Sequence, residues 1–273
     1  MGPVAGCDLM VDRWLGRVPK RLGECVNGLR LAVSWLTVLP VRGPDEVDRG
    51  AAGKAIGWAP VVGALLGVGA AGLLWVLGAM GGSWLLAGLV AVAGLTLITR
   101  GMHIDGLADT FDGLGSYGSP ERAREIMKSG GAGPFGVAAL VFAIGIQAVS
   151  FAALAETGRW AAVVLAVAVG RIAVVLACGR GIEAAPGAGF GALVAGTQGS
   201  AVRLLWGGIA LGAASFVTEH WWLGPIGVGV ALAASMVLVR HCVRRFGGLN
   251  GDVLGAALEI AVTVVAVVLT FGV

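Results

Sequence analysis

Residues 99–136 read TRGMHIDGLADTFDGLGSYGSPERAREIMKSGGAGPFG, and this polar stretch lies between two long apolar runs. Within it, Asp105, Asp109 and Asp112 stand at positions i, i+4 and i+7, which share one face of an α-helix. None of them has a Lys or Arg three or four residues away, so the carboxylates repel one another unless an outside cation joins them. Hard oxygen ligands suit Mg²⁺, and the spacing therefore predicts a Mg²⁺ site. The alternative is an acidic, solvated helix end.

The composition outside this stretch is that of a membrane protein. Of the 273 residues, 57% are hydrophobic, 13% are charged and 48 are Gly, whereas a soluble domain carries about 25% charged residues. We therefore expect an all-α, polytopic transmembrane bundle in which Gly allows close helix packing, with membrane lipid around it and no nucleic-acid partner. The four Cys lie far apart without a CxxC pair, so neither a zinc site nor a disulfide framework is indicated. The N-terminus lacks an apolar signal core, so no cleaved signal peptide is expected.

The apolar runs predict about seven membrane spans after an N-terminal segment. Residues 1–54 are expected to be cytoplasmic or interfacial, with a short interfacial helix over 29–41, a run too short to span. Residues 55–273 are expected to form a transmembrane catalytic domain whose active-site loop, 99–136, contains a short helix. The predicted spans are 58–80, 83–99, 134–155, 160–178, 202–217, 221–239 and 253–271.

The distribution of positive charge predicts the orientation. Of the 19 Lys and Arg residues, all except Arg159 and Arg171 lie in the N-terminal segment or in loops 100–133, 179–203 and 240–252. These segments share one side if all seven spans are real, and the positive-inside rule puts that side in the cytoplasm. We therefore expect a multi-pass protein of the cell (inner) membrane, with the N-terminus and the active-site loops cytoplasmic.

Two residues near or within the apolar runs are candidates for chemistry. His103 is a candidate hydrogen-bond donor to a phosphate, or a candidate base. A purely structural hydrogen-bond donor is an equal alternative for it. Arg171 lies deep in the fourth predicted span, where an ionisable residue is by default a functional candidate whose partner is an anionic substrate or an aspartate. Snorkelling or a buried ion pair is the alternative for Arg171.

The second half of the polar stretch predicts a short helix and a Gly-rich turn. Ser-Pro-Glu at 119–121 is typical of a helix start. In the helix that follows, Glu125 and Lys128 are either substrate contacts or an ordinary surface ion pair. The turn GGAGPFG, at 130–136, has backbone N–H groups that suit phosphate, although it is not a Walker loop.

A second polar region, RRFGGLNGDVLGAALE, occupies residues 244–259. Asn250 and Asp252 begin the seventh predicted span, where Asp252 is either a helix cap or a site residue. Glu259 lies on the same helix face, roughly 10 Å deeper. With Arg245 and the first acidic cluster, these residues indicate Mg²⁺-assisted chemistry on a phosphate-containing substrate.

Three segments resemble the signature regions of the cobalamin synthase family, the adenosylcobinamide-GDP ribazoletransferases. They are HIDGLADTFDGLG (103–115), ERAREIMKSGGAGPFGVAAL (121–140) and FGGLNGDVLGAALE (246–259). LTVLPV (36–41) and GWAPVVGALLG (57–67) are also similar, so the resemblance covers most of the chain from about Leu31.

This resemblance implies an integral membrane enzyme of late vitamin B12 assembly. In that reaction α-ribazole, or its 5′-phosphate, attacks the corrin-side phosphorus of adenosylcobinamide-GDP, GMP leaves, and Mg²⁺ is required. By implication the three aspartates hold Mg²⁺ against the diphosphate, one of them as a possible base. The predicted catalytic residues are Asp105, Asp109, Asp112 and His103, the three aspartates being also the metal ligands. The predicted substrate-binding residues are Glu125, Lys128, Ser129, Arg171, Arg245, Asn250, Asp252 and Glu259.

The chain departs from the family at one position. After EIMK, family members commonly carry an Asp, whereas this chain has Ser129, followed by two glycines. If that Asp contributes to binding, one ligand is lost here, although Ser129 can still reach a metal through water. The oligomeric state stays open, a homo-oligomer included.

Two other classes compete with this interpretation. A CDP-alcohol phosphotransferase also has an Asp-rich, Mg²⁺-dependent membrane site, but its motif has two residues between the first Gly and the Ala, then Arg. Here only Leu107 separates Gly106 from Ala108, and Asp109 replaces the Arg. A transporter with a structural carboxylate cluster is expected to place its charges near mid-span, within broken helices.

Overall fold

The computed structural model describes residues 20–44 and 46–271, and the regular elements of this part are all helices. The all-α prediction is therefore confirmed. The helices are α2 (Lys20–Leu36), α3 (Arg49–Ala79), α4 (Trp84–Ile98), α5 (Met102–Gly115), α6 (Pro120–Met127), α7 (Pro134–Glu156), α8 (Trp160–Ala177), α9 (Phe190–Val194), α10 (Ser200–Ala214), α11 (Leu223–Phe246) and α12 (Gly251–Thr270).

Five helices, α3, α7, α8, α11 and α12, are long and apolar enough to cross a membrane, so the chain is a multi-pass membrane protein. Helices α4 and α5 together form a sixth candidate that is bent by 92°. The predicted spans 83–99 and 202–217 correspond to α4 and α10, each of 15 residues. At 1.5 Å per residue each is about 22 Å long, short of the roughly 30 Å hydrocarbon core. The count of seven spans thus stays a prediction.

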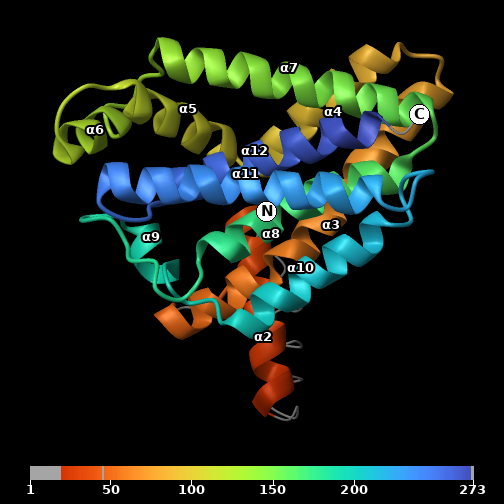
Figure 1. Cartoon of the computed structure of the whole chain (residues 1–273). Helices are drawn as coiled ribbons and strands as arrows, with labels where there is room; N and C mark the ends of the chain where they lie inside the picture. Colours follow the sequence, from red (N-terminus) through yellow and green to blue (C-terminus); the bar gives the residue numbers. More distant parts are fainter. Residues whose placement is uncertain (1–19, 45, 272–273) are drawn as a thin grey trace, which may run out of the picture.

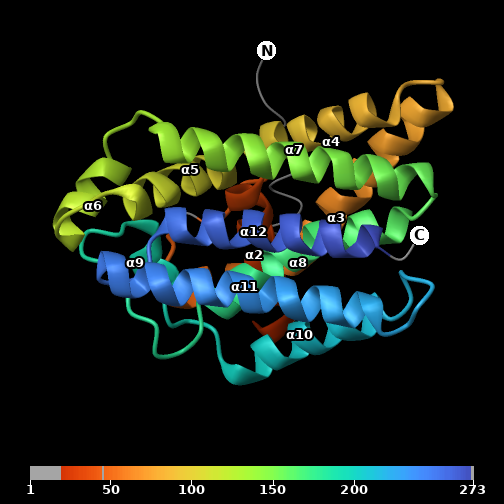
Figure 2. The same cartoon turned by 45° about the horizontal axis from the view of Figure 1, so that its top comes forward.

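Helices α8 and α12 form the centre of the bundle. Most of α8 is buried, and it packs along α3 on one side and α12 on another. The backbones approach closely because the contacts use small residues: a Cβ on Gly67 would lie 2.8 Å from the Cα of Val164. Helices α7 and α11 flank α12, and the three helices run side by side (Figures 1 and 2).

The break between α4 and α5 has a local cause. The N–H of Gly101 donates to the carbonyl of Thr96 (2.8 Å), and the N–H of Arg100 donates to the carbonyl of Leu97 (3.1 Å). This pair of hydrogen bonds is the Schellman motif that ends many helices. Arg100 and Gly101 both have left-handed backbones, with φ of 58° and 68°. Glycine adopts that conformation freely and arginine does not, so Arg100 holds the turn at a conformational cost.

The loops that follow α5, α8 and α11 gather at one end of the bundle, the left end in Figures 1 and 2. The loop after α8 crosses the start of α12: Ala185 N–H donates to Leu249 O (2.9 Å), and Leu249 N–H donates to Glu183 O (2.8 Å). Gly248, with φ of 147°, lies under this crossing, where a Cβ would collide with the backbone of Ala185.

The two predicted short helices are present, one with other bounds. Helix α6 begins as the sequence indicates, with the Ser119 hydroxyl accepting from Arg122 N–H and Pro120 as its first residue. The interfacial helix expected over 29–41 is instead α2, which begins at Lys20, ends at Leu36 and packs on α3. The stretch 99–136, expected as a loop with one short helix, contains two helices, and the first of these, α5, packs against α12 and α7.

Candidate active site

Three carboxylates from two helices line one open cavity of about 780 Å³. Asp105 and Asp109 come from α5, and Asp252 comes from the first turn of α12. The two helices are in backbone contact here, since a Cβ on Gly106 would lie 2.8 Å from the carbonyl oxygen of Asp252. This contact brings together two acidic residues that are nearly 150 positions apart in the sequence.

The charges around this cavity are unbalanced. The negative charges of Asp105, Asp252 and Asp112 all act on Asp109. Neither Asp105 nor Asp109 forms a salt bridge with a Lys or Arg of the described chain. Lys128 lines the same cavity and attracts Asp252. Carboxylates without a cationic partner favour a bound cation.

Asp112 points elsewhere. Its two carboxylate oxygens accept from the N–H groups of Gly133 (2.6 Å) and Gly136 (2.8 Å), at the start of α7. Within the described residues, no three acidic, His or Cys side chains already form a metal-binding group. Metal ligation by Asp112 stays a prediction, and the structure gives this carboxylate a second role as a helix cap.

The candidates on α6 and in the turn after it also fall into two groups, those that line the open cavity and those bonded to other groups. Lys128, Gly130 and Gly131 line the open cavity. The carboxylate of exposed Glu125 instead accepts from Arg122 at 3.2 Å, which is the ordinary surface ion pair considered above, with a different cation. The hydroxyl of Ser129 donates to the carbonyl of Ile126 (2.7 Å), on its own helix end.

The second polar region contributes Asp252 to the open cavity, whereas Asn250 and Arg245 make structural contacts. Asn250, rather than Asp252, caps α12: its Oδ1 accepts from Val253 N–H (3.0 Å), and its Nδ2 donates to Asp252 (3.1 Å). Arg245 donates to the carbonyl of Ser116 (3.0 Å) and so ties the end of α11 to the end of α5.

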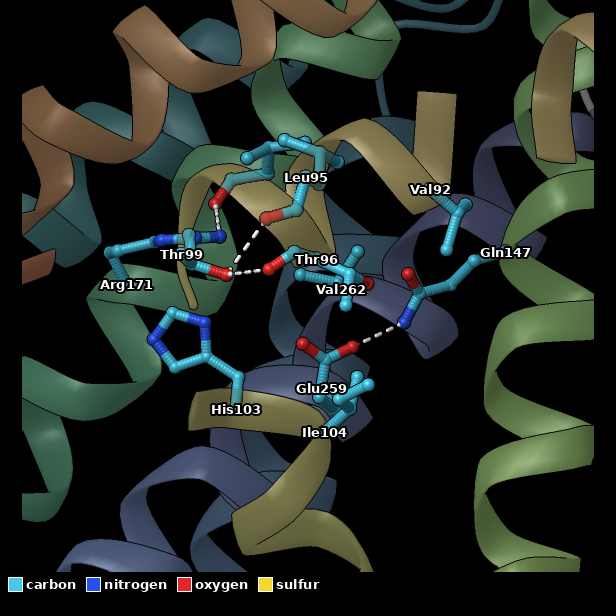
Figure 3. Close-up of a pocket in the computed structure, with 11 residues that line it drawn as sticks. Val92, Leu95, Thr96, Thr99, His103, Ile104, Gln147, Arg171, Glu259 and Val262 are labelled. Carbon is cyan, nitrogen blue, oxygen red and sulfur yellow. Dashed lines mark hydrogen bonds between the residues drawn. The ribbon is translucent and has the colours of Figure 1, made fainter. Parts of the chain in front are cut away.

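A buried polar cluster lies deeper in the bundle. His103, Arg171, Gln147 and Glu259 surround a small cavity of about 20 Å³ (Figure 3), enough for roughly one water molecule. Gln147 donates to the Glu259 carboxylate (2.7 Å). The Arg171 guanidinium makes one long bond to Val167 O (3.3 Å), its Nε has no partner, and it forms no salt bridge with a described carboxylate.

A third cavity, of about 340 Å³, lies between these two sites. It shares Asp105 and Asp252 with the open cavity and His103 and Arg171 with the buried cluster. Its remaining walls are mostly apolar and include the aromatic rings of Trp35 and Phe190.

Among the residues that line these cavities, Arg100, Trp35 and Phe190 have side chains suited to substrate binding and were not predicted from the sequence. Arg100 lines the open cavity, and Trp35 and Phe190 line the third cavity. A polar residue directly after an apolar run was a signal for Arg100, since such boundaries carry the other site residues. No comparable signal marks Trp35 and Phe190, because the loop crossing that places Phe190 beside α12 depends on the tertiary fold.

The fold and these cavities define a multi-pass membrane protein with an acidic, lysine-flanked site at the end of its bundle where the loops gather. The family model described as cobalamin-5-phosphate synthase matches residues 28–270, and the chain belongs to that family.

Three relatives are named adenosylcobinamide-GDP ribazoletransferase. That of Corynebacterium efficiens is 38% identical over 88% of this chain and 90% of its own length. That of Nocardioides sp. is 40% identical over 85% and 93%. That of Bradyrhizobium diazoefficiens is 33% identical over 90% and 95%. No solved structure matches the chain. Membership of this family supports neither the CDP-alcohol phosphotransferase nor the transporter considered above.

Proposed function

We propose that this chain is a membrane transferase of late vitamin B12 synthesis, an adenosylcobinamide-GDP ribazoletransferase. It joins adenosylcobinamide-GDP to α-ribazole, or to α-ribazole 5′-phosphate, and releases GMP. The observation that carries this proposal is the open cavity, where Asp105, Asp109 and Asp252 meet Lys128 in a chain that matches the cobalamin-5-phosphate synthase family over 28–270. Transfer from a diphosphate needs cations that stabilise the phosphate oxygens. It also needs carboxylates that bind a metal ion and accept a proton.

The bond changes define what the side chains must do. A ribose hydroxyl oxygen of the acceptor forms a bond to the corrin-side phosphorus, and the bond from that phosphorus to the bridging oxygen breaks. GMP leaves with the bridging oxygen, and the hydroxyl proton passes to a base. Lys128 and Arg100, which line the cavity, supply positive charge for the phosphate oxygens.

We assign Asp105 as the proton acceptor. It lines both the open cavity and the 340 Å³ cavity, so its carboxylate lies where two substrates can meet. Asp252 shares that position, but one of its oxygens already accepts from Asn250. The resemblance to the family implied that Asp105 is a metal ligand and left open which of the three aspartates is the base; here Asp105 takes the role of base.

The remaining carboxylates suit Mg²⁺. Asp109 and Asp252 would hold the ion, and since the described residues offer no ready three-ligand group, phosphate oxygens and water would complete its shell. Mg²⁺ is commonly bound in this way, by one or two carboxylates plus substrate phosphates. When bound, the ion would neutralise charge on the diphosphate.

We further propose that the chain lies in the cell membrane with the open cavity facing the cytoplasm and lipid around α3, α4, α7 and α11. Large apolar side chains are exposed on these helices, among them Leu65, Leu86, Val141 and Val237. The Lys and Arg residues of the loops support the orientation, as the positive-inside rule requires.

The test is GMP release by purified protein given adenosylcobinamide-GDP and α-ribazole 5′-phosphate, with and without Mg²⁺. We expect Mg²⁺-dependent GMP release with a corrin product. Asp105→Asn should lower kcat by about 10²-fold or more while the Mg²⁺ concentration for half-maximal binding of the corrin substrate is unchanged. Asp109→Asn should raise that Mg²⁺ concentration. Folded wild-type protein that binds the corrin substrate but releases no GMP would overturn the proposal.

A further inference from the structure

The 340 Å³ cavity has the properties of a second substrate site. Its volume is within the usual range for small-molecule pockets, about 300–1,000 Å³. Two of its carboxylates, Asp105 and Asp252, also line the open cavity, so a ligand in one cavity reaches the same groups as a ligand in the other.

One wall of this cavity is aromatic. Trp35 of α2 and Phe190 of α9 meet edge to face, with ring centroids 5.1 Å apart and planes at 70°. Trp35 is half-buried and Phe190 is exposed, and Ile56 and Leu258 also line the cavity and add apolar surface. A planar, uncharged aromatic group is the ligand that such a wall accommodates.

The opposite chemical feature is a buried cation with spare hydrogen-bond donors. Arg171 is 4% exposed, lines this cavity, and has an Nε without a partner. The carboxylate that attracts it, Glu259, accepts a hydrogen bond from Gln147 and forms no salt bridge with Arg171. A buried guanidinium with unused donors favours an anion, and phosphate fits its planar donor geometry.

We propose that this cavity is the acceptor site, which takes an aromatic nucleoside and its 5′-monophosphate. The base lies against Trp35 and Phe190, the phosphate lies at Arg171, and the ribose places its hydroxyl at Asp105. The proposal rests on the proposed function, because α-ribazole is a benzimidazole nucleoside and is the acceptor there. It assigns α2 and the loop carrying α9 to substrate recognition, which the sequence did not suggest.

The test measures binding in the absence of the corrin substrate, so that it does not depend on turnover. Calorimetry with the full-length protein in lipid nanodiscs uses two probes, α-ribazole and α-ribazole 5′-phosphate. Trp35→Leu and Phe190→Leu should each weaken both probes about tenfold, the range expected for loss of one base-stacking contact. Trp75→Leu is the matched control, since Trp75 is 60% exposed on α3 and outside the cavity, and it should bind both probes as the wild type does.

Arg171 provides the more selective readout. Arg171→Gln should weaken the 5′-phosphate at least tenfold and leave the nucleoside within about twofold of the wild type, because only the phosphate meets the guanidinium. Arg171→Lys keeps the charge and should recover part of the difference. A merely structural arginine would weaken both probes equally, and that result would overturn its role here. If Arg171→Gln does not fold, the aromatic variants and Arg171→Lys decide.

The outcomes separate the two proposals. Normal GMP release by the wild type, together with unchanged acceptor binding in Trp35→Leu and Phe190→Leu, would overturn the acceptor site and leave the transferase intact. Wild-type binding that these variants weaken, without GMP release under any condition, would support the acceptor site and overturn the transferase.

Discussion

Asp112 and Asp109 are three residues apart in the sequence and do different work. Asp109 lines the open cavity, while both oxygens of Asp112 accept backbone N–H groups at the start of α7. Removing a charged acceptor from two such donors costs about 1–3 kcal/mol. We therefore expect Asp112→Ala to lower the free energy of unfolding by this amount, measured by denaturation in detergent.

Asp109→Ala is the matched comparison and should leave stability unchanged while GMP release is lost. Asp112→Ala, once folded, should retain Mg²⁺-dependent release, at a reduced rate. A variant at Asp112 with wild-type stability and no Mg²⁺ binding would instead support the metal assignment that the sequence suggested.

At this scale the sequence predicted which residue types form the site better than it predicted their roles. Asp105 and Asp109 were predicted as site residues because they share a helix face and have no cationic neighbour, and both line the open cavity. Glu125, Ser129 and Arg245 lie in similar motif context, yet their side chains bond to Arg122, Ile126 and Ser116. Spacing along a helix predicts which face of the helix a side chain occupies. It does not predict which group from elsewhere in the fold forms a hydrogen bond with that side chain.

The contact between α5 and α12 depends on two glycines, one in each helix, and each lies against the backbone of the other helix. A Cβ on Gly106 would lie 2.8 Å from the carbonyl oxygen of Asp252, and one on Gly255 would lie 3.0 Å from that of His103. Gly106→Ala should therefore push α5 away from α12, cost about 1–3 kcal/mol and separate Asp105 from Asp252. GMP release and the thermal midpoint should both fall.

Gly69→Ala is the matched control for this substitution. Gly69 lies in α3 with nothing within 4 Å of an added Cβ, so the substitution should leave activity unchanged and should not destabilise the protein. Equal effects of the two substitutions would show that the α5–α12 contact is not specific.

The break before α5 shows what an apolar run cannot reveal about an element. Hydropathy predicts one span over 83–99 and a loop after it, because the pattern changes from apolar to polar at Arg100. The structure instead continues as a second helix at 92°, since Arg100 and Gly101 take left-handed backbones. The polar helix then packs against α12 and α7 rather than standing in solvent.

The orientation of the whole molecule is testable with single cysteines. In a chain without its native Cys, Ser119→Cys, at the cavity end, should react with a membrane-impermeant maleimide only after the cells are permeabilised. Ser83→Cys, exposed before α4 at the opposite end, should react with intact cells. The reverse labelling pattern would contradict a cytoplasmic cavity.

The general plan of the molecule follows from its composition, and the crossing of its loops does not. Alternating apolar and polar runs give helices in the right places, since little else can satisfy a backbone in lipid. The hydrogen bonds between residues 183–185 and Leu249 join two loops that share no sequence pattern. A single sequence therefore predicts the bundle and the acidic residues that line the open cavity, but not the aromatic wall that Phe190 completes.

At Gly106 and Gly255 the backbones of α5 and α12 touch with no side chain between them. Sliding one helix along the other would drive each glycine into a carbonyl oxygen, so Asp105 and Asp252 belong to a single rigid block. The two carboxylates would therefore keep a fixed separation while the substrates of the proposed reaction enter and leave.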